Sequence, residues 1–446
     1  MLDLKMFLTL LGQRNPLVPR LCLGTHCLEG SARRIAKHSC LECLAKRGSA
    51  SGAVRSQAEA GNERHSNWER QILLVAMGFV FICSFQFGQC NDWPVARGNS
   101  ESTAIADSKL PSKPVVLWEY KTDSEKSGFE GTPIIYDGKV FVGDFDGTVH
   151  AIDLVTGKKV WTVRKKDGFT TAAAANQGCI VIGDFSGIVY CLNASTGSQV
   201  WTRDIEQPVA SGGNFFGDQV LLTSEGGTMF AMDLKTGEPK WNYATGDQLR
   251  SSPTIWKAFS LLGGCDGQLH KIDLIKGERV GEGVPLQAPT LSTPSIVGKI
   301  AIVPTQPGVV FAIDVETQKI LWTFAETSQA NDIRSSPATL GKFENDQISG
   351  ITVVTTRNRR VLGLNLKDGK VLWETVLKKR TDSSPVICDG RVWVGSVDGL
   401  IYAIDLNNGL ETWSYQLSGQ ILASPAISDS RLVIATEKGS VICFGQ

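Results

Sequence analysis

The sequence has no net charge and few histidines. Lys and Arg number 45, and Asp and Glu also number 45, so the whole chain is not a polycation suited to nucleic acid or anionic lipid. Only five histidines are present, and no nucleophile with a neighbouring base stands out, so we predict no catalytic residue. No segment keeps the 3.6-residue period of an amphipathic helix, which excludes a helical solenoid.

The zero charge is the sum of two unequal parts. Residues 1–70 contain 11 basic and 6 acidic residues, whereas residues 71–446 contain 34 and 39. A basic head therefore precedes a mildly acidic body. The 42% hydrophobic content is enough for a sizeable core and argues against global disorder.

The apolar run Ile72–Phe85 separates the two parts. Its 14 uncharged residues match a signal-peptide core and fall short of the ~20 that span a membrane as a helix. We expect residues 71–90 to be a signal peptide or a membrane anchor and residues 91–114 to be a linker. The body is then exported, to the periplasm or the cell envelope. Residues 1–70 are either a cytoplasmic tail, as the positive-inside rule suggests, or an upstream stretch that is not translated.

Four cysteines in the head form a possible metal-binding pattern. Cys22, Cys27, Cys40 and Cys43 have the spacing C-x4-C-x12-C-x2-C. Four thiolates are a common ligand set for structural zinc, although only the final pair has a usual spacing. A zinc knuckle and a disordered tail are the two interpretations.

Internal repetition is the strongest signal in the body. Tryptophans recur about every 40 residues, and in one double gap of 81 residues Gly281 stands where a tryptophan is expected. The seven tryptophans that mark the repeat are Trp118, Trp161, Trp201, Trp241, Trp322, Trp373 and Trp413.

Each repeat predicts four short strands. In the first full copy, an apolar run follows the small-small-Pro element Gly131–Pro133, and Val140–Gly143 forms the second strand. Thr148–Asp153 alternates with period 2, and Asp146-Gly147 before it is a tight-turn signal. The fourth strand ends at Trp161. Four strands every ~40 residues are typical of a β-propeller blade.

The number of copies fixes the number of blades. Seven copies are complete, and an eighth runs from Ala423 to Gln446 with only three strands. Val115–Lys121 contains the unassigned repeat tryptophan and supplies the missing strand, which leaves no open edge. We therefore predict an all-β, eight-bladed β-propeller over residues 115–446. The sixth copy has about ten extra residues, which we assign to a surface loop at Lys342–Gly350.

The repeat Ala151-x-Asp153-x-x-Thr156-Gly157-x-x-x-Trp161 resembles the tryptophan-docking motif of quinoprotein-type, or PQQ-like, propellers. That family includes alcohol dehydrogenases that use pyrroloquinoline quinone (PQQ). It also includes small non-catalytic members such as the lipoprotein subunit of the outer-membrane barrel-assembly machine. The resemblance implies that each repeat tryptophan packs between neighbouring blades. Gly281 replaces one tryptophan, and Gln318 replaces one turn glycine.

The resemblance also implies which features this sequence should contain if it were one of the dehydrogenases. The dehydrogenases have an adjacent Cys-Cys disulfide, long blade insertions and carboxylates that bind Ca²⁺. The 11 cysteines here include no adjacent pair, and a ring of 332 residues leaves about 41 per blade. We therefore expect no PQQ or other cofactor. We favour a non-enzymatic, exported scaffold that binds protein partners at the envelope. A quinoprotein-like oxidoreductase and a membrane-anchored sensor with a zinc-binding tail are the alternatives.

The residue before each small-small-Pro element should lie at the mouth of the central channel. Four of these residues are charged, namely Glu130, Arg250, Arg334 and Asp382. Converging charges of this kind could bind an anionic ligand or a peptide end. The alternative interpretation is that they form salt bridges with one another across the channel.

Overall fold

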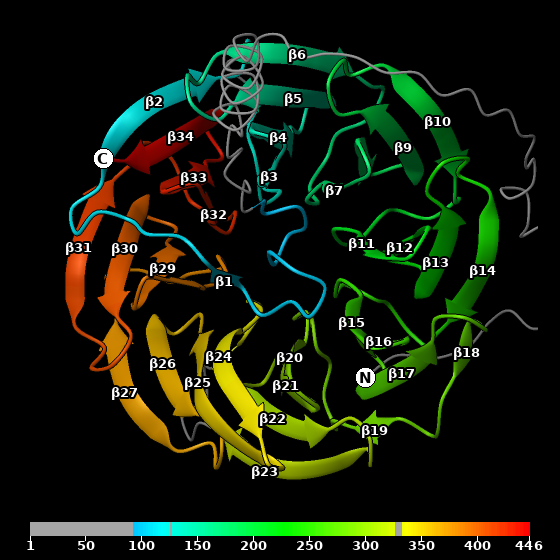
Figure 1. The fold of residues 1–446 in the computed structure, drawn as a ribbon, viewed down its shortest axis with the longest axis vertical. Helices are drawn as coiled ribbons and strands as arrows, with labels where there is room; N and C mark the ends of the chain where they lie inside the picture. The colour runs from blue at the N-terminus through cyan, green and yellow to red at the C-terminus, as the bar shows by residue number, and fades with distance from the viewer. Residues whose placement is uncertain (1–91, 125–126, 326–331) are drawn as a thin grey trace, which may run out of the picture. The chain divides into compact units, whose positions relative to one another are not determined.

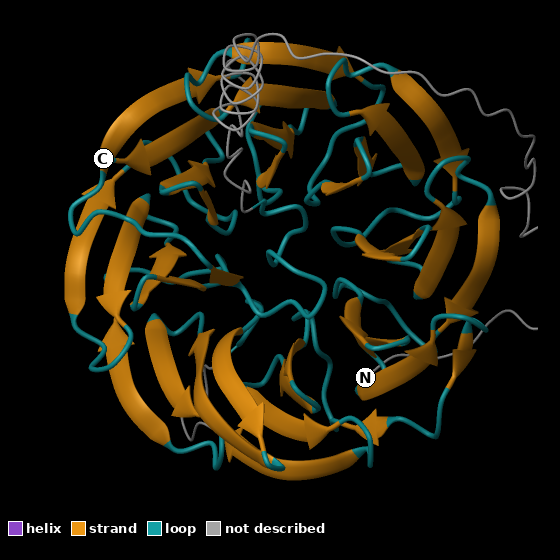
Figure 2. Cartoon of the chain, viewed as in Figure 1, coloured by secondary structure: helices purple, strands orange, loops and turns teal. Residues whose placement is uncertain are grey.

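The computed structural model describes residues 92–124, 127–325 and 332–446. Every regular element in this part of the chain is a β-strand (Figure 2). Accordingly, no helix among the described residues has the length and hydropathy needed to cross a membrane. The strands form eight sheets around a common centre (Figure 1), which confirms the predicted eight-bladed propeller. Residues 1–70 and the apolar run Ile72–Phe85 lie outside the described residues.

The first four blades are antiparallel sheets, each ordered from an inner strand to an outer strand. Blade 1 contains β3 (Ile134–Tyr136), β4 (Lys139–Gly143), β5 (Thr148–Asp153) and β6 (Lys159–Arg164). Blade 2 contains β7 (Ala174–Asn176), β8 (Cys179–Gly183), β9 (Ile188–Asn193) and β10 (Gln199–Asp204). Blade 3 contains β11 (Asn214–Phe216), β12 (Gln219–Thr223), β13 (Thr228–Asp233) and β14 (Pro239–Ala244). Blade 4 contains β15 (Thr254–Trp256), β16 (Phe259–Gly263), β17 (Gln268–Asp273), β18 (Glu278–Arg279) and β19 (Val284–Pro285).

The remaining blades repeat this order. Blade 5 contains β20 (Ser295–Val297), β21 (Ile300–Pro304), β22 (Val309–Asp314) and β23 (Lys319–Ala325). Blade 6 contains β24 (Ala338–Glu344), β25 (Gln347–Thr355), β26 (Arg360–Asn365) and β27 (Val371–Val376). Blade 7 contains β28 (Val386–Cys388), β29 (Arg391–Gly395), β30 (Leu400–Asp405) and β31 (Glu411–Gln416), and β1 (Ile105–Ala106) joins it beside β28. Blade 8 contains β32 (Ala426–Ser428), β33 (Arg431–Ala435), β34 (Ser440–Gly445) and β2 (Val115–Lys121).

Blade 8 joins the two ends of the ring. Strand β2 pairs antiparallel with β34, from Val115 opposite Gly445 to Lys121 opposite Ser440. Figure 1 shows the cyan strand β2 beside the red strand β34. This pairing gives β34 a partner on both edges, because β33 occupies the other one.

The outer strands differ from the sequence-based expectation at the tryptophan. Strand β6 does not end at Trp161 but continues to Arg164. Ala151 opposes Trp161 and Ile152 opposes Lys159, so Val160 is an extra, bulged residue. The same shift in register precedes the repeat tryptophan in seven blades, all except blade 4. A bulge changes the direction of a side chain, which explains how a tryptophan in mid-strand points toward the next blade.

Each tryptophan contacts the following blade in a regular way. The indole Nε1 of Trp161 donates to the Ala194 carbonyl of blade 2 at 3.1 Å, and Trp373 donates to the Leu406 carbonyl of blade 7 at 2.7 Å. Trp118, Trp201 and Trp322 make equivalent bonds. At these five seams, burial of one large ring with a satisfied N–H joins neighbouring blades. The Nε1 of Trp241 has no hydrogen-bond partner among the described residues, although its ring also lies against the turn glycine of the following blade.

The glycine of the following turn makes room for the ring. A Cβ added to Gly197 would lie 2.7 Å from the Trp161 ring, and Gly197 has a φ of +73°. Five other turn glycines meet the preceding tryptophan at similarly short distances: Gly157, Gly237, Gly277, Gly369 and Gly409. The Asp or Asn at the start of each turn accepts hydrogen bonds from the turn, as Asp153 does from Thr156 N and Oγ1. The motif therefore forms a turn whose glycine leaves space for the tryptophan ring of the preceding blade.

Blade 4 is the exception that the sequence marks with Gly281. Its outer strand is broken into β18 and β19, which pair separately with β17. Gly281 faces Gln318, the residue that replaces the turn glycine of blade 5, and the Gln318 amide donates to the Val280 carbonyl at 2.7 Å. In six of the other blades the tryptophan packs on the turn glycine of the next blade, so Gly281 and Gln318 replace both partners of that contact.

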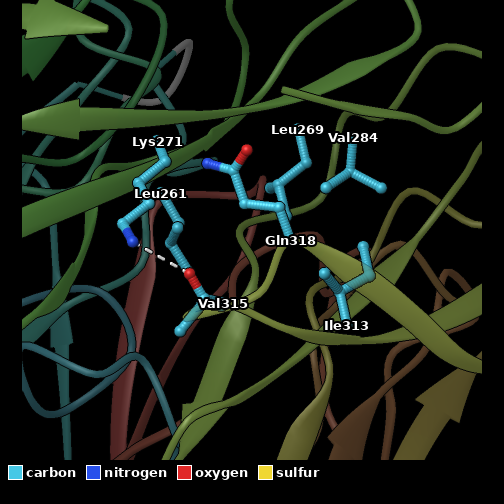
Figure 3. Close-up of a pocket in the computed structure, with 7 residues that line it drawn as sticks. All are labelled: Leu261, Leu269, Lys271, Val284, Ile313, Val315 and Gln318. Atoms are coloured by element: carbon cyan, nitrogen blue, oxygen red, sulfur yellow. Dashed lines mark hydrogen bonds between the residues drawn. The ribbon is translucent and has the colours of Figure 1, made fainter. Parts of the chain in front are cut away.

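Lys271 and Gln318 fill the place of the missing tryptophan between blades 4 and 5 (Figure 3). Lys271 Nζ donates to the Val315 carbonyl at 2.9 Å, and Val315 is equivalent to the carbonyls that accept from the indoles elsewhere. A cavity of about 10 Å³ remains between Lys271, Gln318 and five aliphatic side chains. A cavity of this size holds at most one water. Burial lowers the pKa of Lys271 below its usual value.

The extra residues of the sixth repeat do not form a surface loop, contrary to the prediction. They lengthen the first two strands of blade 6, where Leu340 opposes Ile351 and Glu344 opposes Gln347. Asn345 and Asp346 form the turn with φ angles of 51° and 57°. Two successive residues with positive φ are typical of a type I′ hairpin, for which Asn and Asp are suited. The insertion is therefore a β-hairpin.

The small-small-Pro elements of blades 4 to 8 and of blade 1 are joined to one another by hydrogen bonds. The hydroxyl of the second residue in one blade accepts from the corresponding backbone N–H of the preceding blade. Ser384 Oγ, for example, accepts from Ser336 N at 2.9 Å, and Ser424 Oγ accepts from Ser384 N at 3.0 Å. Equivalent bonds join Ser252 to Thr293, Thr293 to Ser336 and Ser424 to Thr132. The small hydroxyl residues therefore link neighbouring blades at their inner ends.

Residues 92–110, which we call the strap, pass through the centre of the ring (blue in Figure 1). Trp93 is 2% exposed and exchanges two backbone hydrogen bonds with Ile135. Carbonyls of the strap accept backbone N–H groups from the inner strands of six blades, at Ile135, Ala175, Ile255, Ile296, Thr339 and Ile387. The segment for which we expected a linker thus pairs with the free edges of the inner strands.

Candidate functional site

The predicted funnel residues share one face of the ring. Because the strands of a blade alternate in direction, the connections between blades lie on the same side as the turns between second and third strands. We call this side the connection face. Glu130, Arg250, Arg334 and Asp382 each lie in a connection that leads into an inner strand.

Two of these residues belong to a network of ion pairs on blades 6 and 7. Arg334 Nε lies 2.9 Å from Asp332 Oδ2. Arg357 bridges the two connections, with Nη1 3.4 Å from Asp332 Oδ2 and Nε 2.9 Å from Asp382 Oδ1. Arg380 Nη2 lies 3.7 Å from Asp382 Oδ2. We call these five residues the Arg clamp.

The other two funnel residues have different surroundings. Arg250 pairs with Glu225, with 3.3 Å between Nη2 and Oε1, and Glu225 belongs to a turn of blade 3. Burial, together with repulsion from Asp382, raises the pKa of the Glu130 carboxyl. The structure therefore links Arg334 to Asp382 through the ion pairs of Asp332 and Arg357. Glu130 is close enough to Asp382 for the two carboxylates to repel each other. Arg250 is not part of this network, because it pairs with Glu225.

Sequence reasoning missed Arg357 and Arg380. It considered only the residue before each small-small-Pro element, and Arg357 lies on a turn more than 20 residues away from those positions in the sequence. A signal was present in two local basic runs, Arg357–Arg360 and Lys378–Arg380. Aligning these runs with the blade pattern would have placed both on the connection face.

A buried arginine of the strap lies next to the same two blades. Arg97 is 4% exposed, and its Nη2 donates to the carbonyls of Pro337 at 3.1 Å and Pro385 at 2.8 Å. Its Nε and Nη1 have no hydrogen-bond partner among the described residues. Desolvation lowers the pKa of Arg97 to about 9. Arg97 therefore fixes the strap to the inner strands of blades 6 and 7 without a carboxylate partner.

Both histidines of the propeller belong to buried Asp–His–Tyr chains. His150 Nε2 donates to Asp144 Oδ2 at 2.9 Å, and its Nδ1 lies 2.9 Å from the Tyr120 hydroxyl. His270 makes the same two contacts with Asp266, at 2.9 Å, and Tyr243, at 3.1 Å. In each case the tyrosine comes from the preceding blade. The chains connect blades 8 and 1, and blades 3 and 4.

The carboxylates of these chains are occupied. Burial raises the pKa of Asp144, but hydrogen bonds from His150 and from the Thr148 amide outweigh it and hold the pKa below the ordinary value. Among the residues that the structure describes, no group of three or more His, Cys, Asp or Glu side chains is placed to hold a metal ion. Cys22, Cys27, Cys40 and Cys43 lie outside those residues.

The His270 chain predicts a pH dependence of stability. Desolvation lowers the pKa of His270 below its ordinary value of 6.5, despite the nearby Asp266. The unfolded chain therefore binds a proton at a higher pH than the folded chain does, so stability falls as the pH drops below about 6.5. We expect His270→Gln to flatten the dependence of the unfolding free energy on pH between pH 7 and the folded-state pKa, as measured by denaturant unfolding. Parallel curves for wild type and variant would contradict this role.

The hairpin of blade 6 forms a groove on the opposite face of the ring. Its volume is about 520 Å³, and Leu340, Ile351, Leu372 and Leu406 contribute apolar surface to it. Leu340 is 41% exposed and Leu372 is 52% exposed. The groove places an apolar surface on the face opposite the Arg clamp.

The repeat and the ring together define a propeller built of PQQ-type repeats. A family model described as "Outer membrane protein assembly factor BamB" matches residues 112–172, 145–284, 283–386 and 372–445. These matches cover most of the chain, which therefore belongs to this family.

Individual relatives are more distant. The chain is similar to outer membrane protein assembly factor BamB of Yersinia pestis, with 28% identity over 98 residues, or 22% of this chain and 25% of the relative. The chain thus spans about a quarter of the length of that curated relative.

Solved structures show the same fold. BamB from Moraxella catarrhalis superposes with a TM-score of 0.61 at 19% identity, over 75% of this chain and 98% of that one. Quinohemoprotein alcohol dehydrogenase from Comamonas testosteroni superposes with a TM-score of 0.65 at 16% identity, over 80% and 81%. At such identities the likeness concerns the fold alone, so function has to be argued from the site.

Proposed function

We propose that the chain is a non-enzymatic scaffold of the cell envelope that binds protein partners through the connection face. The observation that carries the proposal is membership of a family described as an assembly factor. The Arg clamp supports it, since it places three guanidinium groups at the surface of two adjacent blades. Arg334 and Arg380 have side chains 44% and 46% exposed, so a partner can reach them.

The same network does not fit a quinone site with a calcium ion. Ca²⁺ takes six to eight oxygen ligands, mostly carboxylates and carbonyls. Asp332 and Asp382 are the acidic members of the clamp, and both are paired with arginines. The clamp therefore offers no free carboxylate to a calcium ion.

The first described residue of the strap is held by blade 1. Asp92 Oδ1 accepts from Asp137 N at 3.0 Å, in the turn between the first two strands of blade 1. That turn lies on the face opposite the connection face. We propose that Ile72–Phe85 directs export and either is cleaved or stays as an anchor.

Site-specific photo-crosslinking in intact cells tests the scaffold function. A photoreactive residue at Arg359, on the connection face, is expected to give a discrete adduct with an envelope protein, identified by mass spectrometry. The same residue at Lys235, in a turn of the opposite face, serves as the control. Recovery of the chain in the cytoplasmic fraction, with no adduct from Arg359, would contradict the proposal. Mass spectrometry of the mature N-terminus in the same sample tests whether residues 1–70 are present.

The oxidoreductase alternative makes a separate prediction. We expect the full chain, incubated with PQQ and Ca²⁺, to show neither saturable quenching of tryptophan fluorescence nor dye-linked oxidation of alcohols. Saturable quenching together with oxidation would replace the scaffold proposal by an enzymatic one.

A further inference from the structure

The cations of blades 6 and 7 exceed what their own carboxylates neutralise. The Arg clamp contains three arginines and two aspartates. Arg359, Lys378 and Lys379 are exposed beside it, on the same turn and the same connection. Among the described residues, six cations thus face the two clamp carboxylates. The two nearby acids Glu130 and Asp398 still leave an excess of two positive charges in this described part of the chain. Arg360 does not contribute, because Glu374 pairs with it.

This excess is not a requirement of the fold, because equivalent positions in blade 1 carry other residues. Leu377 N donates to the Arg359 carbonyl just as Lys165 N donates to the Gly147 carbonyl. Shared backbone bonds of this kind align five of the cations with residues of blade 1 or the connections on either side of it. The pairs are Arg334 with Glu130, Arg357 with Phe145, Arg359 with Gly147, Lys379 with Asp167 and Arg380 with Gly168. Five of the six cationic positions are therefore acidic or neutral in the other sector of the ring, whereas Lys378 has a cationic counterpart, Lys166.

The clamp is already arranged for carboxylates. Arg357 contacts carboxylates from two different connections, at 2.9 and 3.4 Å, so its guanidinium is fixed before any partner arrives. Arginine in such a position binds carboxylates with directional, charge-assisted hydrogen bonds. The exposed groups around it, Arg359, Lys378 and Lys379, make no ion pair with any described residue. They are available to the acidic side chains of a partner.

From this arrangement we propose that the connection face of blades 6 and 7 binds an acidic protein segment, with the Arg clamp at the centre and Arg359, Lys378 and Lys379 at the rim. This inference rests on the scaffold function and specifies the chemistry of its partner. A protein is favoured over a nucleic acid because single-stranded binding grooves interleave cations with stacking aromatics. None of the eight residues of the clamp and rim is aromatic.

A binding experiment with a defined probe tests the inference. The probe is a fluorescein-labelled peptide of alternating Glu and Gly, and a Gln and Gly peptide of equal length controls for charge. We expect the acidic peptide to bind the full chain, as measured by anisotropy, and to weaken as salt rises toward about 0.15 M. Lys378→Glu and Arg359→Glu should each weaken binding about fivefold or more. Both residues are exposed, so the fold should tolerate the changes.

Lys166→Glu is the matched control. Lys166 occupies, in the connection between blades 1 and 2, the position that Lys378 occupies in the connection between blades 6 and 7, and its side chain is 90% exposed. It makes the same change in net charge, and binding should stay within about twofold of wild type. Equal weakening by Lys166→Glu and Lys378→Glu would overturn the inference, as would no binding of the acidic peptide at low salt. A labelled oligonucleotide or an anionic vesicle that binds in place of the peptide would also overturn it.

The scaffold proposal and this inference fail in different ways. If Lys378→Glu, combined with the photoreactive residue at position 359, leaves the envelope adduct unchanged, partner binding stands and the acidic-segment inference is wrong. If wild type gives no adduct at all, the scaffold proposal itself is wrong.

Discussion

We expect Trp161→Ala to lower the free energy of unfolding by about 3–5 kcal/mol, the usual cost of removing a large buried aromatic side chain. Trp161 is 9% exposed, its ring covers Gly197, and its Nε1 donates to the Ala194 carbonyl. Truncation therefore removes packing at a blade seam and leaves a carbonyl without its donor. Urea or guanidinium unfolding of the full chain, followed by tryptophan fluorescence and far-UV dichroism, measures the change.

Val160→Ala is the control for this prediction. Val160 is the bulged neighbour of Trp161 and is 42% exposed, so its truncation should change stability by less than about 0.5 kcal/mol. A Trp161→Ala protein as stable as wild type would show that the ring contributes nothing to the seam. Equal losses for both variants would place the effect in the outer strand rather than in the contact between blades.

The ring could be predicted because the same sequence pattern recurs in nearly every blade. One tryptophan, one Asp-Gly turn and one small-small-Pro element recur at fixed distances, so an error in any single copy is corrected by the others. Thr148–Asp153 was predicted with the bounds that β5 has. The closing strand followed from the unassigned Trp118, because an incomplete blade needs a fourth strand.

Features that occur only once in the ring could not be predicted from the sequence. The strap binds mainly through backbone hydrogen bonds to inner strands, such as those of Trp93 with Ile135, and backbone pairing leaves no periodic pattern of side chains. The hairpin of blade 6 lacked a separate signal, since Asn345-Asp346 was read as part of a loop. The Arg clamp depends on two connections and one turn that meet only in the ring. Its acidic residue Asp382 and its Arg334 were found because they belong to the repeat, whereas Arg357 does not.

The bulge before each tryptophan was also missed, for a physical reason. A bulge shifts the register by one residue, and the residue concerned, Val160 in blade 1, is an ordinary strand former. The pattern reads as an uninterrupted strand until the partner strand is known. The structure alone shows that the ring of Trp161 leaves the blade at this point.

The second large prediction concerns the turn glycine on which the ring lies. We expect Gly197→Ala to destabilise the chain by about 2–4 kcal/mol, from two sources. The positive φ of +73° costs an L-residue about 1–2 kcal/mol. The new methyl would also stand 2.7 Å from Trp161 Cδ2 and 3.0 Å from Val163 Cγ2, so the indole must move. Denaturant unfolding of the single variants and of the double variant with Trp161→Ala measures both sources.

The two substitutions should not be additive. Once Trp161 is alanine, Gly197→Ala retains its backbone cost and the looser contact with Val163 but no longer displaces the indole. The double variant should therefore be about 1–3 kcal/mol more stable than the sum of the singles predicts. Gly178→Ala is the matched control, because Gly178 has a φ of +77° with nothing within 4 Å of its added Cβ, and its effect should add to that of Trp161→Ala. Additivity at Gly197 would mean that ring and glycine are independent. The seam between blades 4 and 5 argues against independence, because Gly281 and Gln318 replace both members of the pair together, and Lys271 takes the carbonyl that an indole would otherwise use.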